Sequence, residues 1–89
     1  MKHRVTSQFW QQYHALAEDV RFRADKQFSL FKADPRHPSI QFKKVGDEHG
    51  REIWSARVTL NYRALALKMT DGYLWFFIGD HKDYEAIIS

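Results

Sequence analysis

The stretch IWSARVTLNYRALAL at residues 53–67 decides the class of fold. Apolar and polar side chains alternate along its first half and again after Arg63, which is typical of β-strands that turn one face to a core. We therefore predict two strands, with Arg57 on the outward polar face of the first and Arg63 at the end of the second. The apolar positions are Trp54, Ala56, Val58 and Leu60 in the first strand and Leu65, Leu67 and Met69 in the second.

The residues that follow predict an interior strand and a short helix. Asp71-Gly72 is a strong hairpin signal, because both residues tolerate the positive φ angles of a type I′ turn. Residues 73–78, YLWFFI, are apolar at every position, so helices should cover this strand on at least one side. Asp80 can then cap a short terminal helix. That helix would present His81, Tyr84 and Glu85 near one another.

The N-terminal part of the chain is helical by its periodicity. Apolar residues recur at three- and four-residue steps over residues 9–31. We predict two helices, because the acidic pair at residues 18–19 can accept hydrogen bonds from free backbone amides and a break near Ala17 would form a hairpin. Thr6 or Ser7 can cap the first helix, and two prolines stop the second.

Beyond the prolines the pattern indicates one more strand. Ile40 and Phe42 alternate with polar neighbours, and a polar loop over residues 46–50 follows. The predicted fold class is thus α+β: an N-terminal helical hairpin packed on a mostly antiparallel four-stranded sheet with a short C-terminal helix. We expect residues 1–89 to form a single domain, because 89 residues are too few to stabilise two cores.

Composition narrows the class of protein. The absence of cysteine excludes a disulfide scaffold and thiol chemistry. No stretch approaches the roughly 20 apolar residues of a membrane-spanning helix, so we expect a cytoplasmic protein. The net charge is +3, and the excess of Lys and Arg lies in residues 1–44. Such an excess suits a nucleic acid or an acidic protein partner. The histidines show no metal-ligand spacing, so we expect neither a metal nor another cofactor.

Three segments resemble the RelE/ParE toxin superfamily of bacterial toxin–antitoxin systems: DPRHPSIQFKKV at residues 34–45, IWSARVTLNYRALAL at 53–67 and YLWFFIGDHKDYEAII at 73–88. Their most specific parts are the run Asn61-Tyr62-Arg63 and the run of residues 78–81 that leads to Tyr84. The resemblance implies a type II toxin that a cognate antitoxin neutralises. RelE-branch members cut messenger RNA on the ribosome, whereas ParE-branch members inhibit DNA gyrase.

Metal-free cleavage of RNA needs a general base, a general acid and fixed cations near phosphorus. Arg63 suits the last role, because its planar fork can bind two phosphate oxygens and always carries charge. Histidine exchanges protons near neutral pH, which makes His81 the leading acid or base. The Tyr84 ring could stack on a splayed base. The alternatives are a salt bridge for Arg63, a helix cap for His81 and packing of the last helix for Tyr84.

A second group of residues could bind the RNA backbone. Arg57, Lys43 and Lys44 lie on neighbouring strands and could form a positive groove; the alternative is a solvated sheet face. The chain lacks the glutamate base and the lysine pair of some family nucleases, since Ser55 and Arg57 take the lysine places. The expected function is therefore ribosome-dependent messenger RNA cleavage, with gyrase inhibition or mere antitoxin binding as alternatives.

Overall fold

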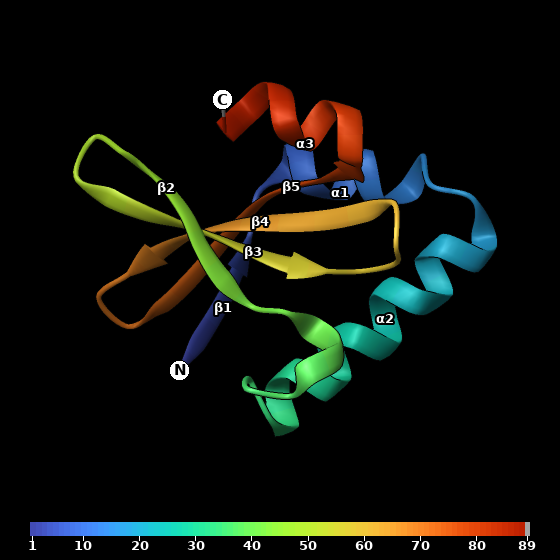
Figure 1. The fold of residues 1–89 in the computed structure, drawn as a ribbon, viewed down its shortest axis with the longest axis horizontal. Coiled ribbons are helices and arrows are strands. Elements are labelled where there is room, and N and C mark those ends of the chain that lie inside the picture. The colour runs from blue at the N-terminus through green and yellow to red at the C-terminus, as the bar shows by residue number, and fades with distance from the viewer. Residues whose placement is uncertain (89) are drawn as a thin grey trace.

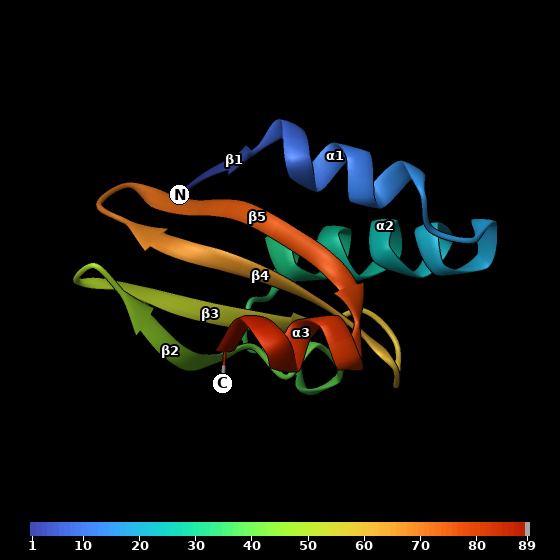
Figure 2. The same ribbon diagram turned by 90° about the horizontal axis from the view of Figure 1, so that it is seen from above.

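The computed structural model describes residues 1–88 and places a five-stranded sheet between helices on its two faces (Figures 1 and 2). The sheet order is β1-β5-β4-β3-β2, and every neighbouring pair is antiparallel except β1 and β5. The elements are β1 (Lys2–Val5), α1 (Ser7–His14), α2 (Glu18–Ala33), the 3₁₀ helix η1 (Pro38–Ile40), β2 (Lys43–Glu48), β3 (Arg51–Arg57), β4 (Tyr62–Met69), β5 (Gly72–Asp80) and α3 (His81–Ile88). None of the described helices is long and apolar enough to cross a membrane. The α+β prediction is confirmed.

The prediction of four strands is wrong, because the N-terminal residues form β1 and pair in parallel with β5. The two backbones approach so closely that a Cβ atom on Gly72 would lie 1.9 Å from the Lys2 carbonyl oxygen. Only glycine fits there. Beyond the end of β1, the Gln12 side chain takes the place of a paired strand: it accepts a hydrogen bond from the Ile78 amide of β5 at 3.1 Å. The outer edge of β5 therefore has hydrogen-bond partners over its first four residues and again at Ile78.

The predicted helical hairpin is confirmed, with a break between α1 and α2 at residues 15–17. Thr6 caps α1 by accepting a hydrogen bond from the Phe9 amide at 3.1 Å. The acidic pair Glu18-Asp19 does not cap α2 with a side chain; both residues lie in its first turn, where negative charge favours the helix dipole. Arg21 stabilises the loop by donating to the carbonyl oxygens of His14 at the end of α1 and of Leu16 in the break.

The strand predicted at Ile40 and Phe42 is misplaced. The prolines instead support η1, and β2 begins at Lys43 and runs through most of the predicted 46–50 loop. Its turn is His49-Gly50, whose φ angles of 51° and 81° allow the tight connection to β3. The β4–β5 hairpin is confirmed, but Met69 pairs with Gly72, so the turn lies one residue earlier than predicted.

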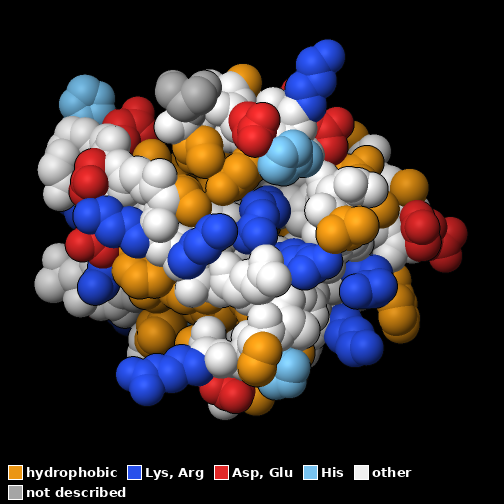
Figure 3. Space-filling model, in the orientation of Figure 1, with side chains coloured by type: hydrophobic (Ala, Val, Ile, Leu, Met, Phe, Trp, Pro, Cys, Tyr) orange, Lys and Arg blue, Asp and Glu red, His pale blue; other side chains and the backbone are white. Residues whose placement is uncertain are grey.

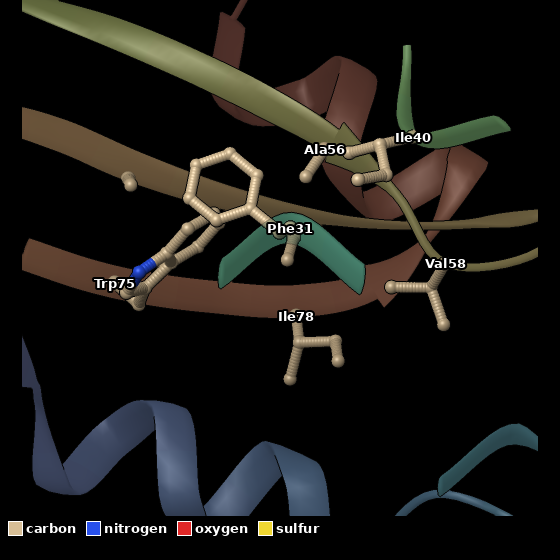
Figure 4. Packing of buried hydrophobic residues seen from close by; sticks show 8 residues of the cluster. Phe31, Ile40, Ala56, Val58, Trp75 and Ile78 are labelled. Carbon is tan, nitrogen blue, oxygen red and sulfur yellow. The ribbon is translucent and has the colours of Figure 1, made fainter. Parts of the chain in front are cut away.

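Both faces of the sheet carry a hydrophobic core. The α1–α2 core contains Phe31, Ile40, Ala56, Val58, Ala64, Ala66, Trp75 and Ile78 (Figure 4). The smaller core under α3 contains Ile53, Leu65, Phe77 and Tyr84. Because α3 covers the second face, Ser55 is fully buried instead of outward-facing. Leu60, predicted in the core, is 80% exposed in the β3–β4 connection.

Candidate active site

Arg63 stands at the start of β4, on the face that α3 covers. Its Nη1 donates a hydrogen bond to Ser55 Oγ at 3.0 Å, and its Nη2 donates to Gln41 Oε1 at 2.9 Å. The guanidinium carbon lies 5.8 Å from the centre of the Tyr84 ring, within the range of a cation–π contact. Three separate parts of the chain therefore hold this cation in place.

His81 begins α3 directly after β5. Its amide donates to the Asn61 carbonyl oxygen at 2.7 Å, and Asp80 caps the helix by accepting from the Asp83 amide at 2.9 Å, as predicted. The imidazole stacks on the Tyr84 ring at 6.0 Å between ring centres and an interplanar angle of 24°. His81 Nε2 lies 3.0 Å from Glu85 Oε1. This contact orients the ring and leaves Nδ1 for a second partner.

Tyr84 connects the two other predicted catalytic residues, since its ring contacts both the Arg63 guanidinium and the His81 imidazole. The ring is only 7% exposed and belongs to the core under α3. The packing role considered for Tyr84 is therefore real, and it also fixes the spacing of the site. The structure brings all three residues together, although their chemical roles stay predictions.

Two of the three predicted RNA-binding residues join this cluster. Arg57 pairs directly opposite Arg63, and Lys43 pairs opposite Ser55, which places both on the same face. Lys44 pairs opposite Trp54 on the other face and forms ion pairs with carboxylates 3.2 and 3.9 Å away. Figure 3 shows a band of Lys and Arg side chains across this side of the molecule. The structure does not bring Lys44 to the cluster.

The cluster of Lys43, Arg57 and Arg63 is not neutralised by neighbouring acids. Within residues 1–88 no carboxylate forms an ion pair with any of the three. Two arginines face each other across adjacent strands, which costs free energy unless an anion or solvent screens them. The cluster can therefore attract a phosphate group and stabilise charge on its oxygens.

Three residues of the site were not assigned a role from the sequence. Ser55 was expected to face solvent, and Gln41 to lie in a strand; both accept hydrogen bonds from Arg63. Glu85 was expected near His81, and the four-residue spacing on a helix was the signal for their contact. Across the described part of the chain, no group of three His, Asp or Glu side chains could hold a metal ion.

The sequence profile of the ParE-like toxin domain family matches residues 18–86. The chain belongs to this family. It is a toxin-domain member of the RelE/ParE superfamily, which confirms the resemblance described above. No curated protein matches the chain in sequence.

Solved structures of other toxins share the fold of this ParE-like domain. RelE in the RelB–RelE complex of Methanococcus jannaschii superposes with a TM-score of 0.71 at 13% identity, over 97% of this chain and 99% of that one. The YoeB/ParE toxin of Agrobacterium tumefaciens gives 0.67 at 16% identity, over 91% and 99%. Isolated Escherichia coli RelE gives 0.60 at 14% identity, over 96% and 93%. The ParE-like domain thus has a RelE-like fold.

Proposed function

We propose that this ParE-like domain is a ribosome-dependent, metal-independent messenger RNA endoribonuclease of a type II toxin–antitoxin system. The observation that carries the proposal is the contact of Arg63, Tyr84 and His81 beside two further cations. That arrangement combines a charge clamp with a group that can move a proton. A surface that only binds a partner would not need a proton-transfer group beside the charge clamp, so the arrangement favours a nuclease.

In the proposed reaction the 2′-hydroxyl oxygen attacks phosphorus and the bond to the 5′-oxygen breaks. Arg63 stabilises the charge on the non-bridging oxygens, while Arg57 and Lys43 hold the neighbouring backbone. Nδ1 of His81 exchanges a proton either with the 2′-hydroxyl or with the departing oxygen. The ribosome would hold the message in position and supply the groups that the isolated domain lacks.

Gyrase inhibition is the second candidate. The matching family is ParE-like, and His81 is the only histidine in the cluster, so among the described residues the cluster offers a single imidazole for a reaction that needs both a general acid and a general base. A non-enzymatic toxin would need the basic face only for binding. The third candidate function is antitoxin binding alone, by a domain that is not toxic.

Expression of the protein in a bacterium separates these functions. We expect new RNA 5′ ends inside translated regions and none in untranslated controls, with normal plasmid supercoiling. Intact messages with relaxed or broken DNA would support gyrase inhibition instead. Unimpaired growth would support a domain that only binds its antitoxin.

We further propose an acidic antitoxin as the partner of the helical hairpin. An apolar hollow of about 150 Å³ lies between the hairpin and the sheet, and Trp10 and Phe28 at it are 47% and 37% exposed. RelE proteins of Pyrococcus horikoshii and Methanococcus jannaschii were crystallised with RelB. A disordered acidic segment that folds on binding would cover this apolar surface and complement the basic N-terminal half.

A further inference from the structure

Gln41 adopts a backbone conformation that glutamine does not favour. It follows η1 with φ 47° and ψ 47°, in the left-handed region, and its amide donates to the Pro38 carbonyl oxygen at 3.3 Å. Glycine or asparagine is the usual residue at such a position, because a larger side chain is strained there. A glutamine at this site indicates that its side chain has a use that outweighs the strain.

That side chain holds Arg63 without cancelling its charge. Gln41 Oε1 and Ser55 Oγ each accept one hydrogen bond from a different guanidinium nitrogen, at 2.9 and 3.0 Å. Partly buried arginines are usually held by carboxylates, which neutralise them. Here both acceptors are neutral. The guanidinium is oriented while its full charge stays available.

The two acceptors are themselves held in place. Ser55 is fully buried on β3, an interior strand of the sheet. The chain just before Gln41 is fixed by Gln27 of α2, whose Nε2 donates to the carbonyl oxygens of Ser39 and Arg57 at 3.2 and 2.9 Å. Two of the five guanidinium donors are used, so three remain for an anion. Such an arrangement is preorganised, because the donors need no rearrangement when charge develops.

We propose that Gln41 and Ser55 are positioning residues that hold Arg63 as an uncompensated cation for the phosphodiester of RNA. This deepens the proposed function and rests on it for the identity of the anion. The hydrogen bonds to Arg63 and the left-handed backbone of Gln41 do not depend on the proposed function.

The test uses the purified full chain and inorganic phosphate, followed by NMR through the Arg63 Nε–Hε resonance, with thermal unfolding in parallel. In Gln41→Gly the backbone strain is relieved, so the melting temperature should stay the same or rise. The apparent Kd for phosphate should nevertheless increase about tenfold, the factor for a lost hydrogen bond to a charged group. Ser55→Ala should weaken phosphate binding in the same way.

Gln41→Glu sharpens the test, because it replaces a neutral acceptor by a carboxylate of nearly the same shape. The fold should remain stable and phosphate binding at Arg63 should be lost. Gln8→Glu on exposed α1 adds the same charge elsewhere and should change the Kd by less than about twofold, since surface charges far from the site are screened.

A Gln41→Gly protein that binds phosphate as the wild type does would overturn the proposal, as would one that melts far earlier, or a wild type without phosphate binding. Cleavage of messages on ribosomes tests the proposed function separately. If the wild type cuts nothing but Gln41→Glu loses phosphate binding, the positioning role stands and the nuclease proposal fails.

Discussion

His81 is the residue at which catalysis and folding can be separated. His81→Gln keeps the size and a hydrogen bond but cannot titrate, so cleavage should fall by about two to four orders of magnitude. The side chain is 61% exposed and its contact with Glu85 is at the surface, where such pairs contribute little stability. The measurement is cleavage by purified protein on programmed ribosomes, with thermal unfolding of the same samples.

His14→Gln, at the exposed end of α1, is the matched control and should cut at the wild-type rate. Arg63→Lys should also reduce cleavage, because an ammonium group cannot reproduce the two-pronged contact, while ribosome binding survives. A His81→Gln protein that melts normally and cuts at full rate would remove this residue from the mechanism.

His3 makes folding stability depend on pH. Its Nδ1 accepts a hydrogen bond from Trp75 Nε1 at 3.1 Å, and burial, followed by the charges of Lys32 and the N-terminal amine, lowers the pKa of His3 below 6.5. The folded state thus resists protonation more than the unfolded state. The contribution of neutral His3 to the free energy of unfolding should be complete above pH 6.5 and should be lost as the pH falls through the lowered pKa of the folded state.

The free energy of unfolding, measured by urea titration at several pH values, should show this fall in the wild type. His3→Gln keeps an acceptor for Trp75 but does not titrate, so its profile should be flatter. Identical profiles for the two proteins would show that a group other than His3 causes the loss of stability at low pH.

At the scale of residues, the sequence predicted side chains whose role depends on their own chemistry. Arg63 and His81 could be singled out because each carries a charge or a proton that the proposed reaction needs. Gln41 and Ser55 could not, since their role depends on a left-handed backbone angle and on a helix that buries one of them. Those features follow from tertiary contacts.

Gln27 joins α2 to two other elements through hydrogen bonds of its side-chain amide. Gln27→Leu would leave the carbonyl oxygens of Ser39 and Arg57 without their donor. The free energy of unfolding should fall by about 2–6 kcal/mol, because each of the two partly buried groups left unpaired costs about 1–3 kcal/mol. Urea denaturation measures the loss. Gln11→Leu on exposed α1 should stay within about 0.5 kcal/mol of the wild type, and an equal effect of both would refute the role of Gln27.

The periods of the apolar residues predicted α1, α2, β3, β4 and β5, because each of these elements turns a regular face to a core. β2 was misplaced because it is a polar strand at the sheet edge, where loop-like composition is common. β1 was missed because four residues give no period, and its partner β5 lies at the other end of the sequence.

For the molecule as a whole, the antitoxin is expected to protect one side. Hydrogen exchange in the toxin–antitoxin complex should slow over residues 7–44 and along a sheet edge, because a folding segment would cover the apolar hollow there. The free toxin is the reference. Exchange that is unchanged throughout these regions would place the antitoxin elsewhere.

The order of helical and strand patterns predicted the overall architecture, because sequential elements usually pack as neighbours. What it could not supply was the second core. The burial of Ile53 and Leu65 requires α3 to fold back across the sheet, and a short helix can dock in more than one place.

The close approach of Lys2 to Gly72 also bears on solubility. Residues 73–78, YLWFFI, have the uncharged, β-favouring composition of segments that stack into cross-β fibrils. The first part of this segment lies inside the sheet because the four residues of β1 pair with residues 72–75 at the outer edge of β5. If β1 detached, the most apolar strand of the protein would become an open edge on which further copies could assemble. We therefore expect this short parallel strand, which has no strong sequence pattern of its own, to protect the toxin against aggregation.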